Sequence, residues 1–154
     1  MIKLQKKWLE AAPWESVVSL NQALCRDKQL EFSPSAKTFD VARQLWEKSS
    51  SRSMTLKEVL DVCRECNDLI PFTFNNGNTF SAIGKTLVAD LIEGLGAVEA
   101  HIVRTTVGHY VAGLIEKREL LEVLRHFDKK WKLSAKAAPK SSPTPAVQAA
   151  PQVT

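Results

Sequence analysis

Apolar residues recur every three or four positions through the first 133 residues of this chain, which is the spacing of amphipathic helices. Proline and glycine punctuate the pattern: Pro13 suits a first helical position and Gly113 suits the residue after a helix end. The periodicity predicts helices over residues 2–11, from 13 to beyond 24, from 34 to about 49, from 55 to 70, from about 79 to 93, over 97–112 and from 116 to about 133.

Two capping signals support these boundaries. Thr55 is followed three residues later by Glu58, so the hydroxyl can accept from a backbone N–H while the carboxylate reaches back to the cap. Ser33 before Pro34 is the pattern of an N-cap followed by a first helical residue. The sequence therefore predicts helix starts at these two places.

The loop over residues 71–79 contains Asn-Gly, which is a tight-turn signal. A short hairpin of residues 71–75 with 78–81 is one interpretation. The helical spacing of the apolar residues that follow favours the other, an irregular loop in which Asn78 or Thr79 caps the next helix.

The composition changes near Ser134. The segment that follows is rich in Ala, Pro, Ser and Thr, and has no aromatic residue, Leu or Ile to build a core. Such a segment cannot bury enough apolar surface to offset the entropy of ordering it. The prediction is an all-α fold: a single compact bundle of about six or seven short helices over residues 1–133, with a disordered tail over 134–154.

Residues 54–64 align without gaps with residues 115–125, and the similarity extends upstream at the same offset, where 41–43 meet 102–104. One interpretation is a duplicated helical hairpin. The other is that both segments are amphipathic helices with the same kind of helix-start pattern. The sequence leaves both open.

The charge is concentrated at the end of the chain. The formal charge is +4, from 21 basic and 17 acidic residues. Residues 129–154 hold five lysines and no acid, so positions 1–128 keep 16 basic against 17 acidic residues, a net of −1. The five lysines form a local basic segment attached to a nearly neutral domain. They are Lys129, Lys130, Lys132, Lys136 and Lys140.

Composition also excludes several classes of protein. Three cysteines, an odd number, argue against a secreted disulfide scaffold. The longest strongly apolar run, over 105–115, is too short for a transmembrane helix. The expected location is the cytoplasm, with no membrane span.

Two short motifs resemble chemical sites and fail on spacing or position. Cys63 and Cys66 form C-x-x-C, but they fall late in a predicted helix and on its apolar stripe, which favours core packing over redox or metal chemistry. Gly84-Lys85-Thr86 lacks the preceding glycine of a phosphate-binding loop at the required spacing. We expect no metal site and no cofactor.

One predicted helix carries a polar stripe that could line a ligand pocket or form a pH-sensitive contact. The alternative is the polar side of a half-buried helix. The stripe consists of His101, Arg104, Thr105 and His109.

Without a persuasive catalytic arrangement, the sequence favours a non-catalytic helical module, an adaptor or scaffold that binds another protein. The first alternative is weak, sequence-independent nucleic-acid binding through the basic C-terminal segment. The second is a small enzyme or ligand-binding domain that uses the His101 helix. The expected partner contacts combine the loop with two tryptophans at possible edge positions: Phe72, Phe74, Asn76, Asn78, Trp14 and Trp131.

Overall fold

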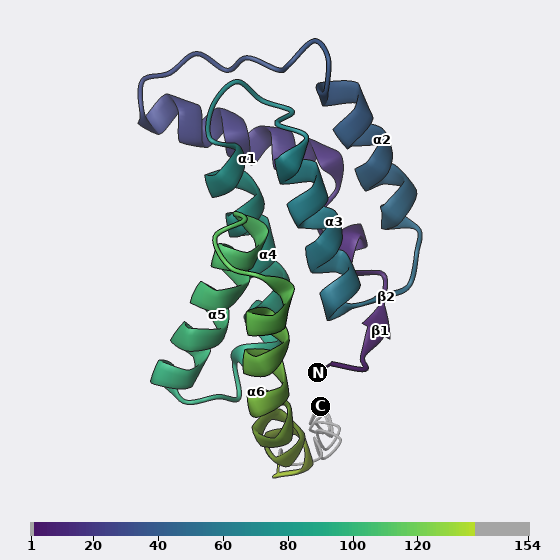
Figure 1. The fold of residues 1–154 in the computed structure, drawn as a ribbon, viewed down its shortest axis with the longest axis vertical. Coiled ribbons are helices and arrows are strands. Elements are labelled where there is room, and N and C mark those ends of the chain that lie inside the picture. The colour runs from purple at the N-terminus through teal and green to yellow at the C-terminus, as the bar shows by residue number, and fades with distance from the viewer. Residues whose placement is uncertain (1, 138–154) are drawn as a thin grey trace, which may run out of the picture.

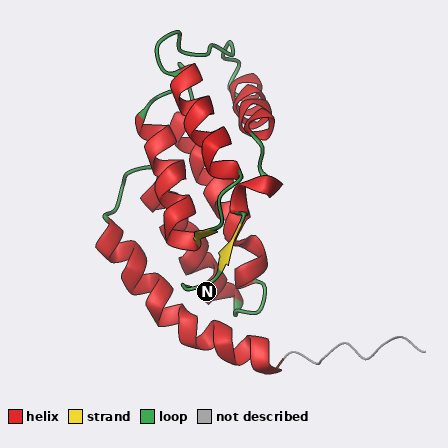
Figure 2. Ribbon diagram, turned by 90° about the vertical axis from the view of Figure 1, so that its right-hand side faces the viewer, coloured by secondary structure: helices red, strands yellow, loops and turns green. Residues whose placement is uncertain are grey.

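The structure of this chain is a computed structural model that describes residues 2–137, and it confirms the all-α fold class. Among these residues, two very short strands and one 3₁₀ turn accompany the helices (Figures 1 and 2). Within the described residues the elements are β1 (Gln5–Lys6), η1 (Trp8–Ala11), α1 (Trp14–Asp27), α2 (Phe39–Ser50), β2 (Met54–Thr55), α3 (Leu56–Asp68), α4 (Asn76–Ile92), α5 (Ala97–Val111) and α6 (Lys117–Ala137).

Helix α4 lies at the centre of the bundle and contacts α1, α3 and α5. Helix α2 packs on α3 and η1, and α6 packs on α5 (Figure 1). Between residues 2 and 137, no helix is both long and apolar enough to cross a bilayer.

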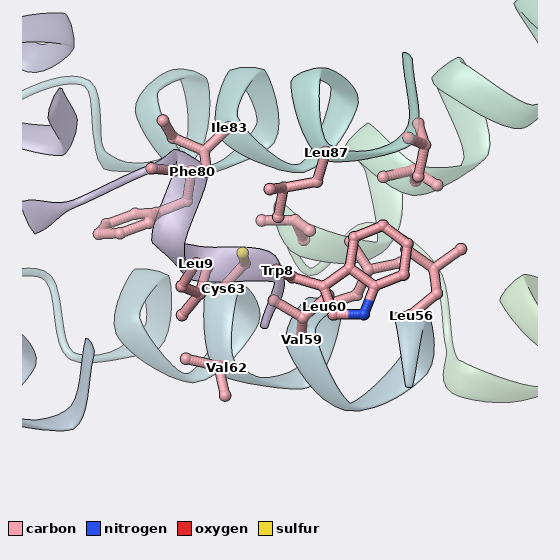
Figure 3. Close-up of a cluster of buried hydrophobic side chains, with 14 of the residues drawn as sticks. Trp8, Leu9, Leu56, Val59, Leu60, Val62, Cys63, Phe80, Ile83 and Leu87 are labelled. Carbon is pink, nitrogen blue, oxygen red and sulfur yellow. The ribbon is translucent and has the colours of Figure 1, made fainter. Parts of the chain in front are cut away.

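The buried face of α3 meets that of α4 around η1. Figure 3 shows Leu60 and Cys63 of α3 on one side, Phe80 and Ile83 of α4 on the other, and Trp8 between the two helices. All five side chains are buried. The apolar stripes that the sequence predicts for these two helices therefore form the core. Burying each large apolar side chain stabilises the fold by about 1.5–3 kcal/mol.

The capping box at Thr55 and the helix end at Gly113 are confirmed. The N–H of Glu58 donates to Thr55 Oγ1 at 3.3 Å, and the N–H of Thr55 donates to Glu58 Oε2 at 2.7 Å. Gly113 has φ +79°. Its N–H donates to the carbonyl of Tyr110, and the N–H of Leu114 donates to the carbonyl of His109. This pair of bonds is a Schellman motif, which ends α5 at the expected place.

The helix expected over residues 2–11 is wrong. Gln5 and Lys6 pair antiparallel with Thr55 and Met54, and η1 follows. The indole N–H of Trp8 donates to the carbonyl of Met54 at 2.7 Å in the core. An isolated helix of this length is marginal, so pairing with a distant segment and burial of Trp8 decide the conformation.

The helix start expected at Ser33 and Pro34 is also wrong, because α2 begins only at Phe39. Pro34 forms an isolated bridge with Phe72. The N–H of Ser35 donates to the carbonyl of Pro71 at 2.8 Å, and a matching bond joins residues 73 and 33. The loop before α2 and the loop before α4 therefore hydrogen-bond to each other through their backbones, and these bonds replace an extra helical turn at the start of α2.

Two further boundaries differ from the prediction. Helix α4 begins at Asn76, with Asn75 as its N-cap residue, so neither Asn78 nor Thr79 caps it. Helix α6 continues to Ala137, four residues beyond its predicted end, into the segment expected to be disordered. The rest of that segment, residues 138–154, lies outside the described residues.

Candidate functional site

A shallow cleft of about 610 Å³ lies at the end of the bundle where α3 ends and α4 begins. Three parts of the chain form it: the last turn of α3 with the residues after it, the first turn of α4, and the end of α5. Most of the side chains that line it are polar and four of them are asparagines. They are Asn67, Asp68, Ile70, Asn75, Asn76, Gly77, Asn78 and Ala112.

The Asn76 side chain fixes the loop beside the cleft. Its Nδ2 donates to the carbonyl of Phe72 at 2.7 Å, and its Oδ1 accepts from the Phe72 N–H at 3.0 Å. Asn75 has φ +61°, a left-handed conformation that Asn tolerates better than most residues. These two asparagines bend the chain into α4 and leave Asn78, two residues after Asn76, exposed in the cleft.

A buried polar network supports the cleft from below. The Nδ2 of Asn21, on α1, donates to the carbonyl of Phe74 at 2.8 Å and to Thr79 Oγ1 at 3.0 Å. Thr79 Oγ1 in turn donates to the carbonyl of Asn75 at 2.7 Å. The sequence prediction missed this network. Its signal was a polar residue at the position between Val17 and Cys25 where the apolar stripe of α1 continues.

Ile70 is the unusual residue at the rim. Its side chain is 59% exposed, and its backbone φ is +52°. A β-branched residue in the left-handed region is an outlier that costs about 1–2 kcal/mol. The nearby Phe74 is 38% exposed. Ile70 is therefore an apolar residue at the rim of the cleft whose backbone is held in a costly conformation.

Asp68 gives the cleft a negative charge. It is exposed at the end of α3, where the helix dipole places partial negative charge, and the last turn of α3 carries no basic residue. On the α4 side, Asn75 Oδ1 accepts from Lys28 Nζ at 2.8 Å. The arrangement suits a cationic group beside Asp68 and amide groups beside the asparagines.

The structure separates the expected partner contacts into two groups. Asn76 and Asn78 line the cleft, and the exposed Phe74 directly precedes Asn75 of its lining. Trp14 and Phe72 are buried and stack in the core with ring centroids 6.1 Å apart, which corrects the expectation that they contact a partner.

Trp131 lies away from the cleft. Its side chain is half-buried on α6, packed against the core. The tryptophan positions at helix edges were therefore core or partly core positions.

The polar stripe of α5 does not form a pocket with the cleft. His101, Arg104 and His109 are exposed and Thr105 is half-buried, and none of them lines the cleft. Gly108, on the same helix, lies against α4, where the Ser81 hydroxyl donates to its carbonyl at 2.9 Å. The stripe is the solvent side of a helix packed through its other face.

The two sequence motifs occupy packing positions. Cys63 and Cys66 are fully buried, and burial raises the pKa of both thiols, that of Cys66 to about 12. Gly84 faces α5, where an added Cβ would lie 3.1 Å from Val111. Among residues 2–137, no group of three or more His, Cys, Asp or Glu side chains is arranged to hold a metal ion.

The basic C-terminal residues lie on α6. Lys129, Lys130 and Lys132 are exposed, and Lys130 pairs with Glu99 of α5. Lys136 falls within α6, and Lys140 lies outside the described residues.

Comparison with known proteins gives no relative: no protein-family model, no curated protein and no solved structure matches the chain.

Proposed function

We propose that this chain is a non-catalytic interaction module that binds an extended segment of a partner protein in the cleft between α3 and α4. The observation that carries the proposal is Ile70, an exposed β-branched residue with φ +52° at the cleft rim. Backbone strain of this kind persists where the surrounding structure enforces it and is typical of functional positions. An Asn or Gly there would cost the fold less.

The chemistry of the cleft suits a peptide. The amide of Asn78 can donate to and accept from a peptide backbone, since it carries both groups. Ile70 offers apolar contact to one side chain of the segment. Asp68 and the adjacent helix end favour a basic residue. The preferred ligand is therefore an extended segment with one large apolar residue beside a Lys or Arg.

A displayed library of randomised peptides, selected against the full chain, tests the proposal. Ile70→Asn removes the apolar rim residue and puts in its place a side chain that the left-handed conformation tolerates. We expect it to leave the free energy of unfolding unchanged or to raise it by up to about 1 kcal/mol, while the selected peptides bind at least tenfold more weakly.

Val41→Asn is the matched control. Val41 is also β-branched and 50% exposed, but it lies on α2, outside the cleft. Peptides selected on the wild type should bind this variant normally. Enriched peptides that bind Ile70→Asn as tightly as the wild type, or a library that yields no enriched peptide, would contradict the proposal.

A further inference from the structure

The N-terminal segment and α6 come together at the end of the bundle away from the cleft (Figures 1 and 2). The backbone N–H of Ile2 donates to Asp128 Oδ1 at 3.2 Å, although 126 positions separate the two residues. The exposed Lys3 follows directly. The N-terminal backbone next to Lys3 therefore lies against the part of α6 that carries the basic residues, a relation that the charge count along the sequence did not reveal.

Helix α6 presents a line of cations on this surface. Arg125, Lys129 and Lys132 stand at i, i+4 and i+7, which is the spacing of one helix face, and all three are exposed. At 1.5 Å per residue they extend over about 10 Å. Position 136 continues the spacing within the helix. We define the basic surface as Lys3, Arg125, Lys129 and Lys132.

Two carboxylates of α6 border this surface and both are already engaged: Glu122 pairs with Arg118, and Asp128 pairs with Lys132. Lys132 Nζ lies 2.9 Å from Asp128 Oδ2. Partial burial alone would raise the pKa of Asp128, but hydrogen bonds, among them those from Lys132 and the Ile2 N–H, lower it to about 2. The carboxylate thus anchors the two segments to each other and offsets one of several positive charges, so the surface keeps a net positive charge.

Over residues 117–132, whose side chains the structure describes, α6 exposes no large apolar side chain of the kind that a membrane-binding helix inserts. Interfacial helices insert an apolar face into the lipid. The apolar face of α6 is buried against the bundle through Leu120, Leu124 and Phe127. Among the described residues, the large hydrophobic side chains that are exposed lie on other elements. A surface that offers charge without an apolar anchor favours a polyanion in water.

We propose that this basic surface binds the phosphate backbone of a nucleic acid without reading its sequence. Phosphate contacts of this kind release counterions, so affinity falls with salt by a logarithmic slope of about −0.9 for each contact with a duplex. Because Asp128 offsets one of the four cations, about three contacts remain, which give a slope of about −2.7 and a loss of affinity of about 40-fold between roughly 50 and 200 mM salt. This interaction is independent of the peptide proposed for the cleft.

The test is the fluorescence anisotropy of a labelled, random-sequence DNA duplex titrated with the full chain at several salt concentrations. The variant with Arg125→Gln, Lys129→Gln and Lys132→Gln is expected to bind at least tenfold more weakly and to lose about 2.7 from the slope. A control with Arg26→Gln, Lys37→Gln and Lys48→Gln loses the same charge from exposed positions elsewhere and should bind within about twofold of the wild type.

A second variant distinguishes a loss of DNA contacts from a loss of folding. Because Lys132 pairs with Asp128, the double variant with Lys3→Gln and Lys129→Gln leaves that ion pair intact and should still lose at least fivefold in affinity. Equal losses in the control would show that net charge alone acts, and would overturn the proposal. So would salt-independent binding, absence of DNA binding at low salt, or tighter binding to phosphatidylserine vesicles than to DNA.

Discussion

The buried side chain of Asn21 connects the core of the bundle to the loop that forms the cleft. Its amide joins α1 to the loop before α4 through the carbonyl of Phe74, and to α4 itself through Thr79. Because Asn21 is fully buried, water cannot replace these bonds without rearrangement. Asn21→Ala is therefore a sensitive test of how the cleft is supported.

The expected loss follows from the contacts. The substitution removes two hydrogen bonds donated by Nδ2, each with a net value of about 1 kcal/mol. It also leaves the Phe74 carbonyl without its partner and opens a small void between α1 and α4, which adds a further fraction of a kcal/mol. The free energy of unfolding should fall by about 2–3 kcal/mol.

Urea denaturation followed by circular dichroism measures the loss. With an m-value of about 2–3 kcal/mol/M, the midpoint should fall by about 1 M. Gln22→Ala is the matched control, since Gln22 is the next residue on α1 and is exposed; it should change stability by less than about 0.5 kcal/mol.

A double-mutant cycle with Thr79→Val isolates the bond between the two side chains. The loss of unfolding free energy in the double variant should be smaller than the sum of the two single losses by at least about 0.5 kcal/mol, since either substitution alone already breaks that bond. Additive losses, or a loss for Asn21→Ala no larger than that of Gln22→Ala, would refute the network as the support of the cleft.

Three further predictions concern other parts of the fold. Cys63 and Cys66 should react with a thiol reagent only as fast as the protein unfolds, since both are buried with raised pKa values; fast labelling of the native protein would contradict this. The lowered pKa of Asp128 stabilises the fold fully above about pH 4, and that stability is lost as the pH falls through about 2; acid titration of Asp128→Asn should show a smaller loss. Gly84→Val should lower the stability by about 1–3 kcal/mol, measured by thermal melting, because a Cβ there would already lie 3.1 Å from a buried valine.

The parts of the fold that the sequence predicted are those whose signals are local. The capping box of Thr55 and Glu58 acts over three residues, and Gly113 ends α5 through bonds to residues in the turn before it. The predictions failed where a partner lies far along the chain. Trp8 bonds to Met54, and Ser35 bonds to Pro71, and no periodicity within either segment contains that information.

The candidate site was predictable only in part for the same reason. The Asn-rich composition of residues 75–78 favoured this loop as a contact site, and Asn76 and Asn78 line the cleft of the proposed site. Ile70 was overlooked because, on the apolar stripe of a predicted helix, it resembled a core residue. Its position directly before Pro71 was the available signal, since a proline disfavours helical conformation in the residue that precedes it.

The two proposed surfaces lie at opposite ends of the bundle, which makes their tests separable (Figure 1). The cleft is formed around the start of α4, whereas the basic surface is formed by the N-terminal segment and the second half of α6. Substitutions at such distant sites should act independently. Ile70→Asn should therefore leave DNA binding intact, and the Lys3→Gln, Lys129→Gln variant should leave peptide binding intact. If either variant abolished both interactions, the cause would be damage to the fold, and neither surface would be supported by its own test.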